Sequence, residues 1–307
     1  NSKMGLTREG KIVALDVEIL SESGPYIGYT EKTLAFATRY AFGPYWIDNM
    51  NIKGKIYKTN NAEIGAFRGF GASESAFMIE TLMNKAAEKL NMTPEAIRKL
   101  NLIREDQLED HFPGAPWKLL SDRVSIEETL QKALEYIGPK PEAKPGKKIG
   151  RGIAVAMPCF EIGDTPGYKG TGADMTMFID GTVNVRIGFP EAGQGITGVV
   201  TKVASEILDI PEDNITIIYC DSHATPKAGS LGFSRGTVNC GNAVLDASKK
   251  LKTKLEEVAG KYLKTKESVE FKKGDFYIKD RLAVKFDEMM DYCYYNGVNL
   301  TVNGWFE

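Results

Sequence analysis

The stretch from residue 174 to residue 198 reads DMTMFIDGTVNVRIGFPEAGQGITG and decides the fold class. Apolar and polar residues alternate on both sides of Asp180-Gly181, a dipeptide typical of the tight turn between two antiparallel strands. The glycine-rich residues 188–198 then lead into apolar residues at helical spacing up to Leu208, and Pro211 ends that helix. Because strands and helices alternate without the regular spacing of parallel units, the sequence predicts an α+β fold with mixed sheets packed against helices.

Further elements are predicted on both sides of this stretch. Thr93 and Pro94 suit the cap and the first position of a helix, and Ser125 with Glu128 has the spacing of a capping box. The apolar pattern predicts a strand at residues 11–20, a helix at 77–90, a helix after residue 93, a helix at 125–137, strands at 151–157 and 215–220, a long helix after residue 241 and a hairpin at 269–278.

A break in composition divides the chain. Residues 139–148, PKPEAKPGKK, are rich in proline and lysine, which is typical of an exposed linker. We therefore expect part of one domain at residues 1–138, a linker at 139–150 and part of a second domain at 151–307. Since the chain begins with Asn1 and enters a strand almost at once, we interpret it as an interior piece of a longer protein.

The overall charge argues against some classes of partner. The 307 residues contain 39 Lys and Arg against 41 Asp and Glu, a formal net charge of −2, without a basic stripe that could follow a phosphate backbone. No apolar run approaches the ~20 residues of a membrane span, and the N-terminus has no signal-peptide pattern. We expect a soluble cytoplasmic protein whose partners are neither nucleic acid nor membrane.

The cysteines and histidines give no metal-binding pattern. The four cysteines, at positions 159, 220, 240 and 293, are far apart, and the only histidines are His111 and His223. Zinc fingers and iron–sulfur loops need closely spaced thiolates around one ion, so neither is predicted. Any redox chemistry must therefore use an imported organic or metallo-organic cofactor.

Three glycine-rich clusters are the candidate ligand sites. The first, residues 65–71 (GAFRGFG), precedes a predicted helix. Its glycines would let the backbone approach a ligand closely, and Phe67 and Phe70 could form a flat apolar wall. The alternative is a tight turn whose phenylalanines point into the core.

The second cluster, residues 191–198 (EAGQGITG), contains G-x-G-x-x-G between a strand and a helix. Unpaired N–H groups at a helix start favour a phosphate, and Asp221 lies near the distance of the ribose-binding acid in a dinucleotide fold. A turn that only caps the helix is a common alternative. Against the dinucleotide interpretation, the preceding strand belongs to a hairpin.

The third cluster is residues 229–243, GSLGFSRGTVNCGNA, which again precede a helix. Arg235 could fork onto a phosphate there, or it could simply face solvent. Two phosphate-type clusters in one domain predict a long ligand with more than one phosphate.

In their order and separations, residues 65–70, 191–195 and 232–243 resemble the molybdenum-binding subunit of the xanthine dehydrogenase and aldehyde oxidase family. The resemblance covers nearly the whole chain. It implies a molybdopterin hydroxylase that oxidises an aldehyde or an N-heterocycle, with water as the source of oxygen and a molybdenum held by the pterin dithiolene instead of by protein side chains. Iron–sulfur and FAD groups would then be supplied by partner subunits or domains.

The resemblance also implies roles for individual residues. The backbone at Arg68 would approach the molybdenum ligands, and Phe70 would stack on a planar substrate as the second residue of the catalytic site. Gln194, between Gly193 and Gly195, would hydrogen-bond the pterin or its phosphate. The pterin and its nucleotide, in a cytosine dinucleotide form, would be lined by Phe233, Ser234, Arg235, Gly236 and Thr237, with Arg235 on the additional phosphate.

Some parts of the family pattern are not matched. The family's upstream substrate-binding segment and the downstream glutamate that serves as the base have no counterpart here, so we expect the isolated chain to be inactive. Phe160 is only a candidate for a second stacking aromatic, and Glu161 fits a solvated loop better than a catalytic base. An NAD-dependent dehydrogenase domain and a non-catalytic interaction module are the two alternatives. A parallel strand order around Gly193 would favour NAD, and an antiparallel hairpin before it would favour molybdopterin.

Overall fold

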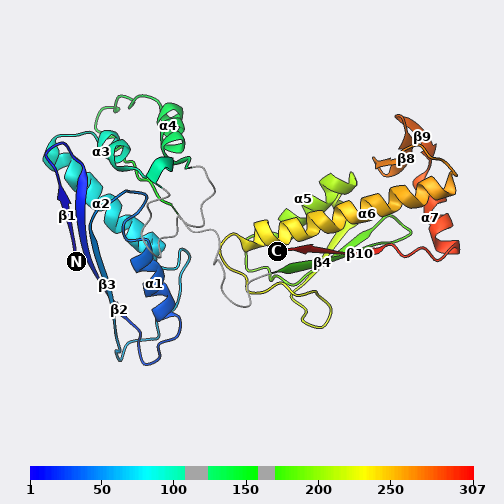
Figure 1. Ribbon diagram of the computed structural model, residues 1–307, viewed down its shortest axis with the longest axis horizontal. Helices are drawn as coiled ribbons and strands as arrows, with labels where there is room; N and C mark the ends of the chain where they lie inside the picture. The colour runs from blue at the N-terminus through cyan, green and yellow to red at the C-terminus, as the bar shows by residue number, and fades with distance from the viewer. Residues whose placement is uncertain (108–123, 158–169) are drawn as a thin grey trace. The chain divides into compact units, whose positions relative to one another are not determined.

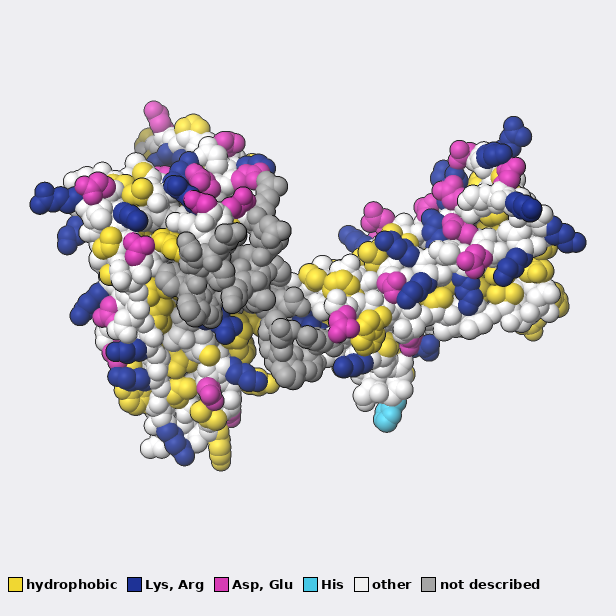
Figure 2. Space-filling view, viewed as in Figure 1, with side chains coloured by type: hydrophobic (Ala, Val, Ile, Leu, Met, Phe, Trp, Pro, Cys, Tyr) yellow, Lys and Arg dark blue, Asp and Glu magenta, His cyan; other side chains and the backbone are white. Residues whose placement is uncertain are grey.

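The computed structural model describes residues 1–107, 124–157 and 170–307 (Figure 1). The chain forms two compact units, Asn1–Pro158 and Cys159–Glu307. Within the described part of the chain, no helix combines the length and the apolar character that a membrane span requires. On the face shown in Figure 2, lysine and arginine side chains are interspersed with acidic ones over both units.

The first unit is built on a three-stranded sheet in the order β1-β2-β3. β1 (Ser2–Leu6) pairs with β2 (Ile12–Glu22) antiparallel, and β2 pairs with β3 (Met50–Tyr57) parallel. The crossover between β2 and β3 contains α1 (Thr30–Arg39), and α2 (Ala72–Leu90), α3 (Pro94–Asn101) and α4 (Ile126–Ile137) follow. The core includes Ile12, Leu15, Val17, Tyr45, Ile47, Ile79, Met83 and Ile97, all buried.

The helix starts of this unit follow their sequence signals only in part. The Thr93 side chain accepts a hydrogen bond from Ala96 N at 3.1 Å, which confirms the predicted cap of α3. α4 begins at Ile126 as predicted, but the Ser125 side chain makes no cap hydrogen bond, so the predicted capping box is not formed.

The predicted strand at residues 151–157 is wrong. These residues form no strand, because the N–H of Val155 donates to the side chain of Glu80 on α2 at 2.9 Å instead of to a neighbouring strand. Ile153, Val155 and Met157 pack against the core of the first unit, which explains their alternating apolar pattern. Residues 139–150, where the linker is predicted, form neither helix nor strand and are largely exposed.

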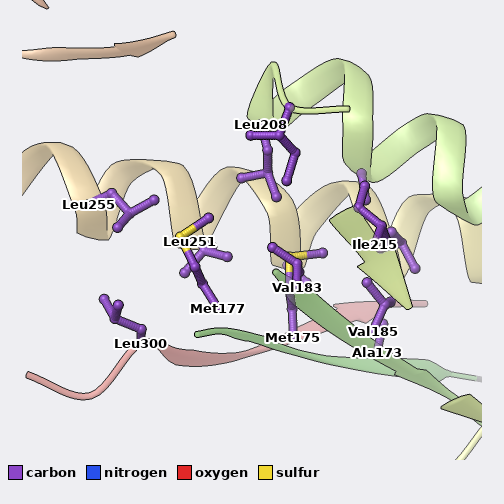
Figure 3. Close-up of a cluster of buried hydrophobic side chains, with 14 of the residues drawn as sticks. Ala173, Met175, Met177, Val183, Val185, Leu208, Ile215, Leu251, Leu255 and Leu300 are labelled. Carbon is purple, nitrogen blue, oxygen red and sulfur yellow. The ribbon is translucent and has the colours of Figure 1, made fainter. Parts of the chain in front are cut away.

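The second unit contains a four-stranded sheet in the order β10-β4-β5-β6. The strands are β4 (Thr171–Met177), β5 (Val183–Ile187), β6 (Ile215–Tyr219) and β10 (Thr301–Phe306). The helices α5 (Ile196–Leu208) and α6 (Gly241–Tyr262) bury its core, with Leu208, Leu251 and Leu255 above Met175 and Met177 (Figure 3). A small sheet, β7 (Glu270–Lys272), β8 (Asp275–Ile278) and β9 (Arg281–Val284), and α7 (Phe286–Tyr295) follow α6.

The strand β5 has one neighbour of each kind. It pairs antiparallel with β4, which confirms the hairpin predicted at Asp180-Gly181, and parallel with β6. The mixed sheets confirm the predicted α+β class. The antiparallel pairing with β4 is the arrangement expected for molybdopterin binding, and the parallel pairing with β6 is the one expected for NAD binding. The strand order alone therefore does not distinguish the two cofactors.

The last strand lies directly on the long helix. A Cβ atom on Gly304 of β10 would be 2.1 Å from the carbonyl oxygen of Ala243 and 2.6 Å from the backbone nitrogen of Ala247, both on α6. Only a residue without a side chain allows this approach, so Gly304 fixes the distance between the sheet and the helix.

Candidate functional site

The first glycine cluster forms a turn in an unusual conformation. Gly69, Phe70 and Gly71 all have positive φ angles, 99°, 52° and 92°. A Cβ atom on Gly71 would be 2.4 Å from the carbonyl oxygen of Thr33, so the turn lies against the backbone of α1. Glycine is required at both flanking positions, and Phe70 is held between them in a conformation that an aromatic residue adopts only at a cost.

The aromatic residues of this turn are not core residues. Phe67 is 84% exposed, which rules out the alternative in which both phenylalanines point into the core. Phe70 is half-buried and meets the rings of Tyr29 and Phe36 edge to face, with centroid distances of 6.2 and 5.4 Å. Arg68 is exposed. The Phe70 ring is thus fixed by two aromatic neighbours while part of its surface stays accessible.

The second glycine cluster is organised by a carboxylate of its own. Glu191 Oε1 accepts hydrogen bonds from the N–H groups of Gly193 at 2.8 Å and Gly195 at 3.0 Å, and Oε2 accepts from the N–H and hydroxyl of Thr197 at 3.3 and 3.4 Å. These bonds to backbone N–H groups, Gly195 first, lower the pKa of Glu191. The start of α5 is therefore already occupied by an anion that belongs to the chain.

The Gln194 side chain is also bound within this loop. Its Oε1 accepts from the N–H of Ala192 at 2.7 Å, and its Nε2 donates to the carbonyl of Pro190 at 2.8 Å. Gly193 and Gly195 have φ angles of 93° and 82°, and a Cβ at either would meet no atom within 4 Å. The polar groups of the Gln194 side chain thus have partners within the loop, while the space at the two glycines would let a ligand come close to the backbone.

The third cluster is anchored by Arg235. Its side chain is 2% exposed, donates from Nε to the carbonyl of Ser230 at 3.2 Å and from Nη2 to that of Ala228 at 3.1 Å, and lies over the ring of Phe189. The alternative of a solvent-facing arginine is wrong. The guanidinium fixes residues 228–235, and its contact with a cofactor phosphate stays a prediction.

The residues after Arg235 start a helix with an irregular first turn. A π-helical segment, η4 (Gly236–Cys240), continues directly into α6, and such segments are frequent at functional sites. Phe233, just before it, has a φ of 53° and is 39% exposed. Within the described residues, the N–H groups of Ser234 and Thr237 donate to no acceptor. In contrast to α5, this helix start has donors to offer to a ligand.

The structure brings the second and third clusters together. Gly236 is buried against Ile196, the first residue of α5, and a Cβ on Gly236 would be 3.4 Å from Ile196 Cδ1. The predicted cofactor-binding residues thus lie at two adjacent helix starts of the second unit: Gly193, Gln194, Gly195, Phe233, Ser234, Arg235, Gly236 and Thr237. Arg68 and Phe70 belong to the first unit.

Several residues of the site escape prediction from the sequence. Glu191 receives no role from its motif, because it lies four positions before Gly195, the cap residue of α5, and does not have the spacing of a capping box. Tyr29, Phe36 and Phe189 carry no local signal, since they reach the site only through the fold. Phe160 and Glu161 lie outside the described residues. In the described ranges, no three His, Cys, Asp or Glu side chains gather where they could hold a metal ion.

The donor pattern argues against the NAD alternative. A dinucleotide pyrophosphate needs the amides at the start of α5, and Glu191 already occupies them. Asp221, the candidate ribose-binding acid, accepts instead from the N–H of His223 at 2.9 Å within its own turn. Although β5 and β6 pair in parallel, the α5 amides and Asp221 that a dinucleotide would need already have partners within the chain.

Comparison with known proteins gives matches over both units. Two different domain families, both described as "Molybdopterin cofactor-binding domain", match the chain, one at residues 1–102 and the other at residues 129–307. The chain is 27% identical to "Xanthine dehydrogenase 1" of Arabidopsis thaliana over 99% of the chain and 21% of that protein. It is 28% identical to "Aldehyde oxidase 3" of Mus musculus over 99% of the chain and 22% of that protein. The chain thus spans about a fifth of the length of these relatives.

A solved structure shares the fold. The chain superimposes on quinoline 2-oxidoreductase from Pseudomonas putida 86 with a TM-score of 0.71 at 19% sequence identity, over 100% of the chain and 42% of that protein. At this identity the likeness concerns the fold alone.

Proposed function

The chain belongs to the molybdopterin cofactor-binding domains of the xanthine dehydrogenase and aldehyde oxidase family, and on this basis we propose that it works within a molybdenum hydroxylase that oxidises an aldehyde or an N-heterocycle. The match at both residues 1–102 and residues 129–307 carries the proposal. When bound, the molybdenum cofactor supplies the two-electron oxidation, with oxygen from water.

We propose that the second unit holds the cofactor at the two adjacent helix starts. Ser234 and Thr237 donate their N–H groups to phosphate oxygens, and the exposed face of Phe233 lies along the pterin or nucleotide. Gln194 and the open backbone at Gly193 and Gly195 contact the pterin. The fit is supported by these free donors and by the space at the glycines. Two phosphates, as in a cytosine dinucleotide form, would use both the loop before η4 and its first turn.

We propose that Phe70 of the first unit holds the substrate. Tyr29 and Phe36 fix the ring edge to face, so a planar aldehyde or heterocycle can stack on the accessible part without moving it. Arg68, which is exposed in the same turn, is the residue whose backbone would approach the molybdenum ligands. Iron–sulfur and flavin groups on partner subunits or domains accept the electrons.

We propose that the 307 residues alone do not turn over substrate. They correspond to 22% of Aldehyde oxidase 3, so most of the surroundings of a cofactor would come from elsewhere in the longer protein. A cofactor enclosed on one side stays solvated and is released readily.

The test is elemental and pterin analysis of the full-length protein, purified in active form from its source. We expect stoichiometric molybdenum and a pterin that becomes fluorescent after denaturation and oxidation. Release of CMP on mild acid hydrolysis would identify the cytosine dinucleotide form. Active enzyme without molybdenum would overturn the proposal.

A further inference from the structure

The carboxylate of Glu191 takes the place that an anion would take at the start of α5. Both of its oxygens are used: Oε1 accepts from Gly193 and Gly195, and Oε2 accepts from Thr197. Gly195 is the cap residue of α5, and Thr197 is in its first turn. The amides that remain without helical partners at this end are the ones that bind phosphate in other proteins.

We propose that Glu191 is a positioning residue that acts as a built-in anion, closing the start of α5 to phosphate and holding the Gly193–Gly195 loop ready for an uncharged part of the cofactor. The role of the loop toward the cofactor rests on the proposed function. The closing of the α5 start to phosphate is independent of it, because it concerns only residues of this chain.

Electrostatics supports this division of roles. A phosphate brought to the start of α5 would have to displace the carboxylate or lie beside it, and two anions at one helix end repel each other. Replacing four charge-assisted hydrogen bonds by others of the same kind would gain little. The neighbouring helix start differs, since the N–H groups of Ser234 and Thr237 find no acceptor among the residues that the structure describes.

The same contacts give the loop a fixed shape. Gly193 and Gly195 are each held by Glu191, and the Gln194 side chain between them is held by Ala192 and Pro190. A loop ordered before binding loses less conformational entropy when the cofactor arrives. Glu191 therefore acts through the loop and does not need to touch the cofactor.

Hydrogen exchange on the 307-residue chain tests the proposal without any cofactor. The probe is inorganic phosphate, and the readout is the exchange rate of the amides of Gly193, Gly195 and Thr197. In the wild type we expect protected amides whose rates do not change with phosphate. In Glu191→Ala we expect exchange at least about tenfold faster, in line with the loss of charge-assisted hydrogen bonds, and protection that phosphate restores.

Two further variants make the result specific. Glu191→Gln keeps one carbonyl oxygen for the glycine amides but presents an NH₂ group to Thr197, so exchange should rise mainly at Thr197. Glu206→Ala removes the same charge from an exposed position farther along α5 and should leave all three rates unchanged. Rates in Glu191→Ala within twofold of the wild type, or protection of the wild-type amides by phosphate, would overturn the proposal.

The cofactor part is read separately in the full-length enzyme. Pterin content should fall in Glu191→Ala and stay at the wild-type value in Glu206→Ala. Equal pterin in all three proteins would overturn the role of Glu191 toward the cofactor. Absence of molybdenum and pterin from the active wild type would instead overturn the proposed function, and the exchange result would stand.

Discussion

Ile196, the first residue of α5, lies against Gly236, the first residue of η4, so that a Cβ atom on Gly236 would be 3.4 Å from Ile196 Cδ1. Both residues are buried, and they join two loops that are about forty positions apart in the sequence. The consequence is one composite surface at the starts of two adjacent helices. One start is filled by Glu191, and the other offers the amides of Ser234 and Thr237, which have no acceptor in the described part of the chain.

This contact predicts a size limit at position 236. Gly236→Leu places a branched side chain against Ile196 and Leu231, and overpacking of this kind costs about 1–3 kcal/mol. Gly236→Ala should cost clearly less, because the end of the flexible Ile196 side chain can move by a few tenths of an ångström. Urea unfolding of the two variants measures the difference, and a Leu variant as stable as the wild type would contradict the contact.

Phe70→Ala should impair turnover by the full-length enzyme without loss of cofactor. The loss of one stacked aromatic pair is worth ~0.5–1.5 kcal/mol, so we expect a decrease in kcat/KM of up to about tenfold. Phe67→Ala is the matched control, since Phe67 lies in the same turn but is 84% exposed. Equal effects of the two variants, or normal kinetics in a small folded fraction of Phe70→Ala, would assign Phe70 a structural role only.

Arg235→Ala should destabilise the second unit. The truncation removes the donors to the carbonyls of Ser230 and Ala228, and hydrogen bonds to a charged group contribute about 1.5–3 kcal/mol each. Arg235→Lys cannot make both bonds from one planar group and should be only partly better. Urea unfolding and pterin content are measured together. Unchanged stability with lost pterin would favour the direct contact with a cofactor phosphate over the structural role.

Local signals predicted much of the fold. The Asp180-Gly181 hairpin, the Thr93 cap of α3 and the bounds of α4 follow from residues that are neighbours in the sequence. Long-range pairing left no such signal: Thr301 of β10 lies beside Thr176 of β4, 125 positions away. The pattern at residues 151–157 was misleading because a buried extended segment and a strand bury alternate side chains alike. The two are distinguished by the hydrogen bond of the Val155 N–H, which goes to the side chain of Glu80 and not to the backbone of a neighbouring strand.

The candidate site was predictable in position more than in chemistry. The glycines at 193 and 195 marked the start of α5, because their positive φ angles favour glycine whatever the ligand, and the glycine at 236 marked the start of η4. Whether the amides at the start of α5 are available to a ligand depends on where the Glu191 side chain points. The sequence does not show that direction. The burial of Arg235 likewise depends on Phe189 and on carbonyls of its own loop.

Gly304→Ala should be severely destabilising. The added methyl group would meet the carbonyl oxygen of Ala243 at 2.1 Å, and this backbone atom of α6 cannot rotate away as a side chain can. We expect a loss of at least about 3 kcal/mol, at the upper end of overpacking effects. Gly260→Ala is the matched control, because that glycine of α6 has open space and alanine there should stabilise the helix by about 0.5–1 kcal/mol. Urea unfolding of the chain should show opposite signs for the two variants.

A buried polar network in the first unit allows the last prediction. Arg98 is fully buried and donates to Glu80 Oε2 from Nε at 2.9 Å, and Tyr45 donates to Glu80 Oε1. Burial and the carboxylate of Glu80 raise the pKa of Tyr45, so its hydroxyl stays protonated and remains a donor. Glu80 Oε2 also accepts from the N–H of Val155.

Glu80→Gln removes the only negative charge of this network and leaves the Arg98 guanidinium buried, which should cost about 3–5 kcal/mol of unfolding free energy. Tyr45→Phe removes one hydrogen bond and keeps the ion pair, so we expect a smaller loss of about 1–2 kcal/mol. Urea unfolding gives both values, and hydrogen exchange at Val155 adds a local readout. Exchange at that amide should accelerate in Glu80→Gln and stay slow in Tyr45→Phe, since only the first variant weakens its acceptor. Slow exchange at Val155 in both variants would mean that the segment at residues 153–157 is held by its apolar contacts and not by Glu80.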